Sequence, residues 1–425
     1  MRGLDRSDIV ISGVGVTSSI GQGKAAFISA LLEGRHRFDV MRRPGRQRPP
    51  HSGSSLEDIA KSEHAPCFLG AEILELSVPE SIPATMLRTA SFSGQVAIAT
   101  LHQAWEDAGL DKVAPERIGL VVGGSNFQQR ELIQGHDAYR GREQFLRPTY
   151  GMSFMDSDLC GLCTEAFGIR GFAYTVGGAS ASGQLAVIEA IHSVESGRVD
   201  VCIAIGALMD LSYWECQGLR SLGAMGSDRY ANEPALACRP FDRDRDGFIF
   251  GESCGVVVIE KQQSARRLER SPYALLSGWA IAMDANRNPN PCVEGEVAAI
   301  KAALERGKLS PSDIDYINPH GTGSAIGDVT ELQSIRQCGL GHAQLNVTKS
   351  IIGHGLSAAG TVEMIAVLLQ MKEGKLHPTR NLENPIEPSF NWTGSHAIFH
   401  TMENALNLSM GFGGINTAVC LQRCS

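Results

Sequence analysis

Two similar turns, each leading from a glycine-rich stretch into a helix-like stretch, constrain the fold of this sequence most. The first is "VGGAS", which ends a strand-like run and precedes a helix expected from Ala181. The second is "IIGH", which we interpret as the end of another strand, before a helix expected from Leu356. Each half then closes with glycine-rich apolar strands, "FIFGESCGVVVIE" and "LSMGFGGINTAVCLQ". We therefore predict a duplicated α/β fold whose halves span residues 1–260 and 261–425.

Strand-like and helix-like runs alternate along both halves. Apolar runs such as "IGLVVGG", "VDVCIAIGALM" and "ESCGVVVIE" are typical of buried strands. Because ligands of α/β sheets bind where several strands end, we expect a site between the halves. The spacing of apolar residues predicts helices over residues 24–34, 85–109, 181–197, 292–308, 328–339 and 356–374.

Composition narrows the classes of function. The chain has 425 residues, 43% of them hydrophobic, and a net charge of -8, which argues against a general nucleic-acid binder. Its longest apolar helix-like run is interrupted by Glu363, so we expect no membrane span. The eleven cysteines follow no disulfide framework, and the first residues lack the apolar core of a signal peptide. These features predict a cytoplasmic protein with reduced thiols.

One segment departs from the acidic average. "RHRFDVMRRPGRQRPP", residues 35–50, contains six arginines and three prolines against one aspartate. We expect it to be exposed, irregular and strongly positive. It is either a solvated loop or a docking patch for an acidic partner, and the sequence leaves both open.

Three motifs resemble ligand sites but lack an essential part. "GVGVTSS" has no third glycine at dinucleotide-loop spacing. "DRDRDGFIFGES" begins like a calcium loop, but Ser253 stands where the bidentate glutamate belongs, and Glu252 falls one position short. Cys160 and Cys163 form a solitary CxxC, for which buried packing is the better interpretation. We expect no nucleotide cofactor and no metal.

The candidate reactive residues lie in glycine-rich turns. Ser180 follows "VGGA" at the start of a helix, where it is either a helix cap or a side chain mounted for chemistry. His320 in "INPHGTGSAIGD" and His354 in "TKSIIGHGLSAAG" have glycines nearby that allow a substrate to approach closely. The cluster "GFGGIN" offers backbone amides. Such donors suit a reaction that builds negative charge on a thioester carbonyl oxygen.

Five segments in order, "DIVISGVGV", "RPFDRDRDGFIFGESCGVVVIE", "HGTGSAIGD", "TKSIIGHGLSAAGTVE" and "SMGFGGINT", resemble the β-ketoacyl-ACP synthases of the thiolase superfamily. The resemblance covers nearly the whole chain. It implies a duplicated five-layer αβαβα fold and a homodimer.

Ser180 is the important departure from that family, whose motif has a cysteine nucleophile at this position. A condensing enzyme holds its acyl chain as a thioester, and serine without a dedicated base is a far weaker nucleophile. Both histidines remain. The pattern is similar to the decarboxylase-type ketosynthases of polyketide β-branching cassettes, which convert malonyl-ACP to acetyl-ACP.

The resemblance also implies a role for each matching residue. His320 and His354 would stabilise the enolate, and the backbone amides of Ser180 and Phe412 would form an acyl oxyanion hole. Lys349 and Glu363 would position the histidine loops. The substrate would arrive on the phosphopantetheine arm of a malonyl-loaded acyl carrier protein, with no other cofactor and no metal.

Two alternatives keep the fold but change the function. The protein is a condensing synthase if Ser180 is a working nucleophile or replaces a native cysteine. It is a non-catalytic subunit similar to a chain-length factor if it only shapes a partner's cavity. Because such subunits tend to lose the histidines as well as the cysteine, His320 and His354 argue against the second alternative.

Overall fold

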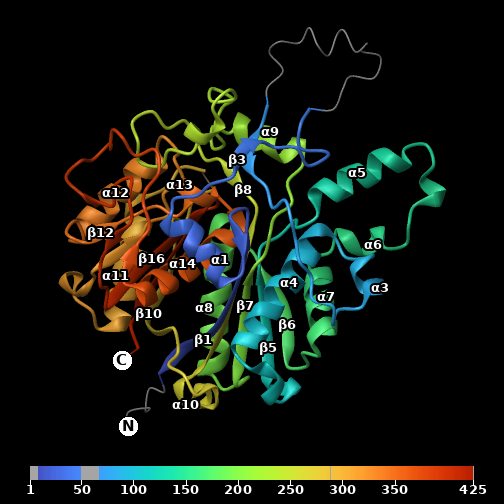
Figure 1. Ribbon diagram of the computed structural model, residues 1–425, viewed down its shortest axis with the longest axis horizontal. Coiled ribbons are helices and arrows are strands. Elements are labelled where there is room, and N and C mark those ends of the chain that lie inside the picture. Colours follow the sequence, from blue (N-terminus) through green and yellow to red (C-terminus); the bar gives the residue numbers. More distant parts are fainter. Residues whose placement is uncertain (1–7, 49–66, 288, 425) are drawn as a thin grey trace.

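The computed structural model describes residues 8–48, 67–287 and 289–424, and most of its strands join one path of paired strands (Figure 1). The path runs from β14 at one end to β6 at the other, and β2 pairs with β1. Strands of the N-terminal half are β1 (Ile9–Ser18), β2 (Gly21–Gln22), β5 (Ile118–Gly123), β6 (Phe172–Val176), β7 (Val201–Gly206) and β9 (Ser253–Lys261). Strands of the C-terminal half are β10 (Ala274–Met283), β11 (Tyr316–Asn318), β12 (Gln344–Leu345), β14 (Asn391–Trp392), β16 (Asn404–Gly411) and β17 (Ile415–Gln422).

The two halves repeat one topology. The order across the path is β1, β9, β7, β5, β6 in the N-terminal half and β10, β17, β16, β11, β12 in the C-terminal half. In each set the first three strands pair antiparallel and the last two join in parallel. The sets meet where β1 pairs with β10, Val10 opposite Leu275 and Ile11 opposite Ala274. The predicted duplication is therefore confirmed.

Helices form three layers around these strands. The layers consist of α4 (Phe92–Asp107) with α7 (Ser157–Phe167), α8 (Ser182–Glu195) with α14 (Ala359–Glu373), and α11 (Val293–Gly307) with α12 (Gly327–Gln337). The α8–α14 pair contacts strands of both halves and lies between them, whereas the other two pairs cover the outer faces (Figure 1). This is the five-layer αβαβα arrangement of the thiolase fold.

Shorter elements complete the described chain. Two small sheets contain β3 (Phe38–Val40), β4 (Leu69–Ala71) and β8 (Phe250–Gly251), and β13 (Lys375–Leu376) with β15 (Ile398–Phe399). The remaining helices are α1 (Lys24–Leu32), α3 (Ala84–Leu87), α5 (Gln129–Tyr139), α6 (Tyr150–Ser153), α9 (Tyr213–Ser221), α10 (Gln262–Ala265) and α13 (Lys349–Ile352).

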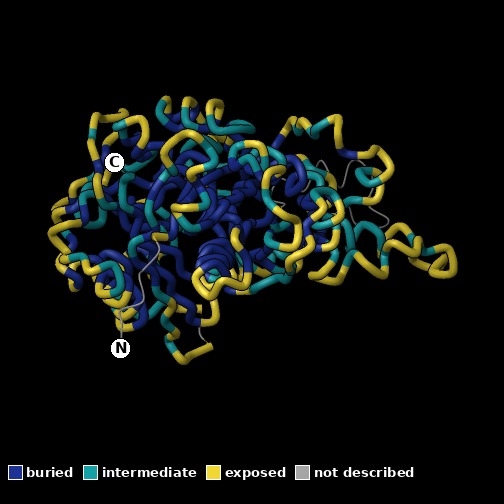
Figure 2. The backbone as a smooth tube through the Cα atoms, turned by 90° about the horizontal axis from the view of Figure 1, so that it is seen from below, coloured by how far each residue is buried: buried dark blue, intermediate teal, exposed yellow. Residues whose placement is uncertain are grey.

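The apolar core follows the layers. One large cluster of buried side chains includes α8 and α14, and a further cluster lies beneath each outer helix layer. Buried backbone accordingly occupies the middle of the molecule in Figure 2, with exposed loops at its edges. Gly206 shows how closely the layers approach, because a Cβ there would lie 2.1 Å from Thr361 Oγ1. α14 is buried from Ala359 to Met371, so any charged group on it needs an internal partner.

Two local predictions are wrong. The helix expected over residues 85–109 is divided into α3 and α4, because Ser91 caps α4 by accepting a hydrogen bond from Gly94 N at 3.1 Å. The strand expected at "IIGH" is instead the short helix α13, which ends where Gly353 adopts a φ of 80°. Helices α5 and α7 were not predicted.

The basic segment 35–50 is less exposed than predicted, and Pro49 and Pro50 lie outside the described residues. Arg46 is completely buried, and Arg43, which is half-buried, pairs with Glu252 at 2.8 Å. The partners of Arg46 are Glu72, Asp210 and Glu252, at 3.0, 2.8 and 2.6 Å. These carboxylates come from distant parts of the chain and need a cation once they are buried together. The other described arginines of the segment are exposed.

Two further properties concern the chain as a whole. Across residues 8–48, 67–287 and 289–424, no helix has both the length and the apolar character needed to cross a bilayer. All eleven cysteines carry free thiols, most of them buried. Cys160 and Cys163 pack inside the N-terminal half, as the sequence indicates.

Candidate active site

Ser180 lies in a strained turn between β6 and α8. One turn of 3-10 helix joins the two elements, and Ala179 has a φ of 47°, which is uncommon for residues other than glycine. Ser182 ties the turn together by accepting from Gly178 N at 2.9 Å and donating to Ala179 O at 2.7 Å. The N-cap position of α8 is occupied by Ala181, without a side-chain hydrogen bond. Ser180 is therefore not the helix cap.

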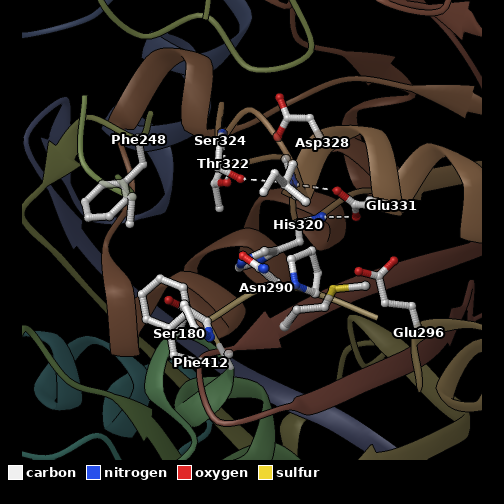
Figure 3. A pocket seen from close by; sticks show the side chains of 18 of the residues that line it. Ser180, Phe248, Asn290, Glu296, His320, Thr322, Ser324, Asp328, Glu331 and Phe412 are labelled. Atoms are coloured by element: carbon white, nitrogen blue, oxygen red, sulfur yellow. Dashed lines mark hydrogen bonds between the residues drawn. The ribbon is translucent and has the colours of Figure 1, made fainter. Parts of the chain in front are cut away.

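A cavity of about 320 Å³ brings Ser180 together with both candidate histidines (Figure 3). Ser180 Oγ lies 3.0 Å from His354 Nε2. The ring centroids of His320 and His354 are 5.5 Å apart, and the rings are nearly perpendicular. Residues from the two halves of the chain thus meet in one place, as expected for a site between them.

His354 is fixed by its backbone as well as by its neighbours. Its N–H donates to Ile249 O at 2.7 Å, and its carbonyl accepts from Gly251 N at 3.1 Å. The Phe248 ring stands edge-on to the imidazole, with centroids 5.1 Å apart. These contacts join the His354 loop to the end of the N-terminal half and leave its ring little freedom.

The His320 loop is held by Glu331, which sequence reasoning does not single out. The Glu331 carboxylate accepts hydrogen bonds from His320 N at 2.5 Å and from Gly321 N at 2.8 Å. Asp328 supports the same loop through Gly323 N at 3.0 Å. The sequence did contain a signal for this support, because the helix after "HGTGSAIG" begins with two carboxylates, Asp328 and Glu331. They lie about one turn apart and therefore share a helix face.

Lys349 and Glu363 lie side by side beneath the histidines. Lys349 Nζ donates to the His320 carbonyl and forms an ion pair with Glu363, and both side chains are buried. This places the predicted supporting pair next to the His320 loop. Lys349 is also the internal partner that the carboxylate of Glu363, buried on α14, requires.

Burial determines the protonation states of the ionisable side chains around the cavity. It lowers the pKa of His320 and of His354 well below 6.5, and the positive charge of Lys349 lowers both further. Burial raises the pKa of Glu331 and of Glu363 to about 7, although their hydrogen-bond partners act in the opposite direction. Both imidazoles are therefore neutral at neutral pH.

The position of the hydrogen on each imidazole follows from its surroundings. Nδ1 of His320 and Nδ1 of His354 are buried and have no hydrogen-bond partner within the described part of the chain. Buried N–H groups without a partner are rarer than unpaired acceptors, so we assign the hydrogen of each ring to Nε2. In this tautomer His354 Nε2–H donates to Ser180 Oγ.

Phe412 lies at the turn between β16 and β17 and lines the same cavity as Ser180 (Figure 3). A Cβ on the preceding Gly411 would lie 2.1 Å from Gly178 O, so only glycine allows the Phe412 turn to approach the Ser180 turn this closely. The ring is 41% exposed. The two residues whose amides form the predicted oxyanion hole thus belong to adjoining turns.

The motif that resembles a calcium loop has a structural role. Asp242 accepts hydrogen bonds from Asp244 N at 2.9 Å and from Asn384 N at 2.8 Å, and it pairs with Arg239 at 3.2 Å. Among the described residues, no group of three or more His, Cys, Asp or Glu side chains is arranged to hold a metal ion.

Comparisons with known proteins agree with this fold. The family model described as "Beta-ketoacyl synthase, N-terminal domain" matches residues 6–265, and "Beta-ketoacyl synthase, C-terminal domain" matches residues 273–383. The chain is 61% identical to "Polyketide biosynthesis malonyl-ACP decarboxylase PksF" of Bacillus subtilis, over 98% of this chain and 96% of that protein. It is 30% identical to "3-oxoacyl-[acyl-carrier-protein] synthase 1" of Haemophilus influenzae, over 97% of this chain and 98% of that protein.

Solved structures extend the comparison to three dimensions. A β-ketoacyl synthase from Burkholderia phymatum superposes with a TM-score of 0.85 at 25% identity, covering 99% of this chain and all of that one. The fold, the two family models and the high identity to a relative over nearly its full length lead to one conclusion. The chain belongs to the β-ketoacyl synthase family.

Proposed function

We propose that this protein decarboxylates malonyl-ACP to acetyl-ACP and does not condense acyl chains. The observation that carries the proposal is the cavity in which two neutral imidazoles lie beside Ser180, whose Oγ is 3.0 Å from His354 Nε2. The relative named as a malonyl-ACP decarboxylase, 61% identical, supports the same reaction.

The two histidines perform the carbon–carbon cleavage. The malonyl thioester oxygen is bound by Nε2–H of His320 and by Nε2–H of His354, which turns from Ser180 Oγ to the substrate when the substrate binds. When the bond between C2 and the carboxylate breaks, its electron pair moves into the enolate, and carbon dioxide leaves. Two fixed N–H donors stabilise the negative charge that develops on the oxygen. Each neutral ring keeps one N–H, assigned to Nε2, with which it donates to the enolate oxygen.

Ser180 does not hold an acyl chain in this account. A serine nucleophile needs a base that removes its proton. His354 Nε2 is the neighbouring nitrogen, but it carries a hydrogen and donates it to Ser180 Oγ, so it cannot serve as that base. We assign the backbone amides of Ser180 and Phe412 to the acyl oxyanion hole, where they add donors beside the thioester.

Lys349, Glu363 and Glu331 position the catalytic groups. Lys349 and Glu331 hold the two sides of the His320 loop, through its carbonyl and its amides respectively. Glu363 keeps Lys349 in place. None of the three needs to touch the substrate, and the loss of any one should displace an imidazole from the thioester oxygen.

The substrate reaches the cavity on the phosphopantetheine arm of an acyl carrier protein, without another cofactor or a metal. Leu222, Ile326 and Phe412 are exposed residues of the cavity lining and offer apolar surface to such an arm. Decarboxylation of this kind supplies acetyl units for polyketide β-branching, and we place the protein in the cytoplasm.

We further propose a homodimer built from two halves per chain, residues 1–260 and 261–425. β6 ends the strand path, and every one of its residues is half-buried. The nearby arm of α5 and α6 (Figure 1) carries or adjoins the exposed side chains of Phe145, Met152 and Phe154. An unpaired strand edge next to exposed apolar side chains is suited to pairing with a second copy. Light scattering should give twice the mass of the chain.

Mass spectrometry of the carrier tests the reaction. Malonyl-loaded acyl carrier protein is incubated with the enzyme, and a long-chain acyl-ACP is added in a parallel tube. We expect conversion to acetyl-ACP in both tubes and no β-ketoacyl product. Unchanged malonyl-ACP, or a β-ketoacyl product in the second tube, would reject the proposal.

A further inference from the structure

The proposed decarboxylation leaves one chemical requirement unmet. Once carbon dioxide has gone, C2 of the enolate must gain a proton to become the methyl group of acetyl-ACP. The two histidines stabilise the enolate through its oxygen, and a donor is still needed at the carbon. The inference below rests on the proposed function and concerns the origin of that proton.

The Ser180 hydroxyl lies beside the histidine pair, on the N-terminal side of the cavity. Its oxygen lies 3.0 Å from His354 Nε2, and it is nearly buried, with an exposed fraction of 9%. A thioester oxygen bound at His354 Nε2 would therefore lie a few ångströms from Ser180 Oγ. C2 is two bonds from that oxygen, so it comes within reach of the same hydroxyl.

The hydrogen of Ser180 is free for transfer. In the assigned tautomer, His354 Nε2–H donates to Ser180 Oγ, so the hydroxyl accepts from the histidine and its own hydrogen is available to the cavity. When the thioester oxygen takes over His354 Nε2–H, the Ser180 hydrogen stays available to the cavity. The ring is kept neutral by burial, so this arrangement holds at neutral pH.

The turn around Ser180 stabilises what the transfer leaves behind. Ser180 stands just before α8, a helix of 14 residues, and the N-terminal end of a helix favours negative charge. An oxygen that has lost its proton there lies at this helix end, and His354 Nε2–H returns to it once the thioester carbonyl has re-formed. Both groups are fixed before the reaction begins.

Glu296 is the competing acid in the cavity wall. Burial, with Glu331 nearby, raises its pKa to about 9, so it carries a proton at neutral pH. Its Oε2 is buried without a hydrogen-bond partner within the described residues. In Figure 3, however, Glu296 lies across the cavity from Ser180, on the other side of His320. The hydroxyl beside His354 is better placed for C2.

We propose that Ser180 is the catalytic acid that completes the reaction by giving its hydroxyl proton to C2 of the enolate. The electron pair released by carbon–carbon cleavage forms the new C2–H bond, and Ser180 Oγ becomes an alkoxide. The enolate oxygen is then a neutral carbonyl, so His354 Nε2–H returns to Ser180 Oγ and stabilises the alkoxide together with the start of α8. Water entering the cavity then returns a proton to the alkoxide, the hydroxide formed leaves to solvent, and the enzyme is restored.

The competition between protonation and return of carbon dioxide tests this role. Wild type, Ser180→Ala and Ser180→Thr are incubated with malonyl-loaded acyl carrier protein and carbon-13-labelled bicarbonate. Two quantities are measured by mass: acetyl-ACP formed, and label entering the remaining malonyl-ACP. A longer-lived enolate captures more labelled carbon dioxide, so the ratio of exchange to acetyl formation reports on proton donation.

The Ser180→Ala variant should form acetyl-ACP roughly 10²-fold more slowly, within the range of general acid catalysis. Its exchange ratio should rise by a similar factor, and the hydroxyl of Ser180→Thr should reverse much of both changes. The matched control is Ser357→Ala, the same substitution at the corresponding turn of the other half, which should leave the ratio unchanged.

An unchanged exchange ratio in Ser180→Ala overturns the proposal, whether or not turnover falls, because a purely positioning role would not prolong the life of the enolate. An increased ratio in Glu296→Gln, with none in Ser180→Ala, would assign the proton to Glu296 instead. If wild type forms no acetyl-ACP, the proposed function itself fails, which is a separate outcome.

Discussion

The turns before α8 and α14 occupy matching places in the two halves, but the hydroxyls of their serines have different partners. Ala179 and Leu356 have positive φ angles of 47° and 51°, and each is followed by a serine and a long central helix. Ser357 Oγ donates to Ala207 O at 2.7 Å. Ser180 Oγ instead faces the cavity and lies 3.0 Å from His354 Nε2.

This difference separates a structural serine from a functional one on the same backbone. The hydroxyl of Ser357 is used to join its turn to the end of β7, across the boundary between the halves. The hydroxyl of Ser180 instead meets the imidazole of His354 in the cavity, and Ser182 stabilises the turn itself. The N-terminal half therefore supplies the free hydroxyl, and the C-terminal half supplies both histidines.

Removing either histidine should have the largest effect. His320→Ala or His354→Ala takes away one of the two donors to the enolate oxygen, and we expect turnover to fall by about 10²- to 10³-fold. The rate of acetyl-ACP formation measures it. His192→Ala is the matched control, because His192 lies on α8 outside the cavity and is half-exposed. Unchanged turnover in both cavity variants would contradict the assignment of His320 and His354 as donors to the enolate oxygen.

The paired serine variants compare the two turns directly. Ser180→Ala should lose roughly 10²-fold in turnover, with little change in the free energy of unfolding. Ser357→Ala should keep most of its turnover but lose about 1–2 kcal/mol of that free energy, because it leaves the Ala207 carbonyl without a donor. Urea denaturation and acetyl-ACP formation are measured on both. If both variants lost the same free energy of unfolding, Ser357 could not be called the structural serine and Ser180 the functional one.

Weakening the support of the His320 loop should have a smaller effect. Glu331→Gln exchanges a charged acceptor of two amides for a neutral side chain with one acceptor oxygen. We expect about a tenfold loss of turnover, equivalent to one charge-assisted hydrogen bond. Because both Glu331 oxygens accept from backbone amides, we expect KM to change less than kcat in steady-state kinetics. A change confined to KM would mean that Glu331 contacts the substrate.

The pH dependence of stability should show the smallest effect. The folded-state pKa values of His320 and His354 lie below 6.5, so the unfolded chain binds protons first as pH falls. The stability contributed by each neutral ring is fully present above pH 6.5 and is lost toward acid. Each ring should account for about 1.4 kcal/mol between pH 7.5 and 5.5.

Urea denaturation at these two pH values measures this loss, with His320→Gln as the comparison. Wild type should lose more stability on acidification than the variant, by about the amount of one ring. Equal losses in the two proteins would mean that His320 is not held neutral by burial.

Local sequence pattern predicted the parts of the molecule that depend on neighbours along the chain. The glycines before Ser180 and around His320 mark turns, and the order of apolar strands indicates the duplication. Arg46 was wrongly expected to be exposed because its three buried partners lie far away in sequence. Glu331 was missed for a similar reason, since its bonds to the His320 loop depend on how α12 folds back beneath it.

The short helix α13, just before His354, shows another limit of prediction from the sequence. Its residues are apolar enough for a strand, but Lys349 must reach Glu363 and the His320 carbonyl, and these contacts are made from the helical conformation of α13. A tertiary ion pair of this kind overrides local preference and leaves no periodic signal in four residues.

The most direct test of the central claim is the intact mass of the enzyme itself. The protein is incubated with a long-chain acyl-ACP and malonyl-ACP together, and its mass is followed while malonyl-ACP is consumed. The account predicts that malonyl-ACP disappears while the mass of the enzyme stays constant, because the N-terminal turn holds a hydroxyl that no base activates. An enzyme heavier by one acyl group would show that Ser180 takes up chains, and the distinction between the two serines would then need a different explanation.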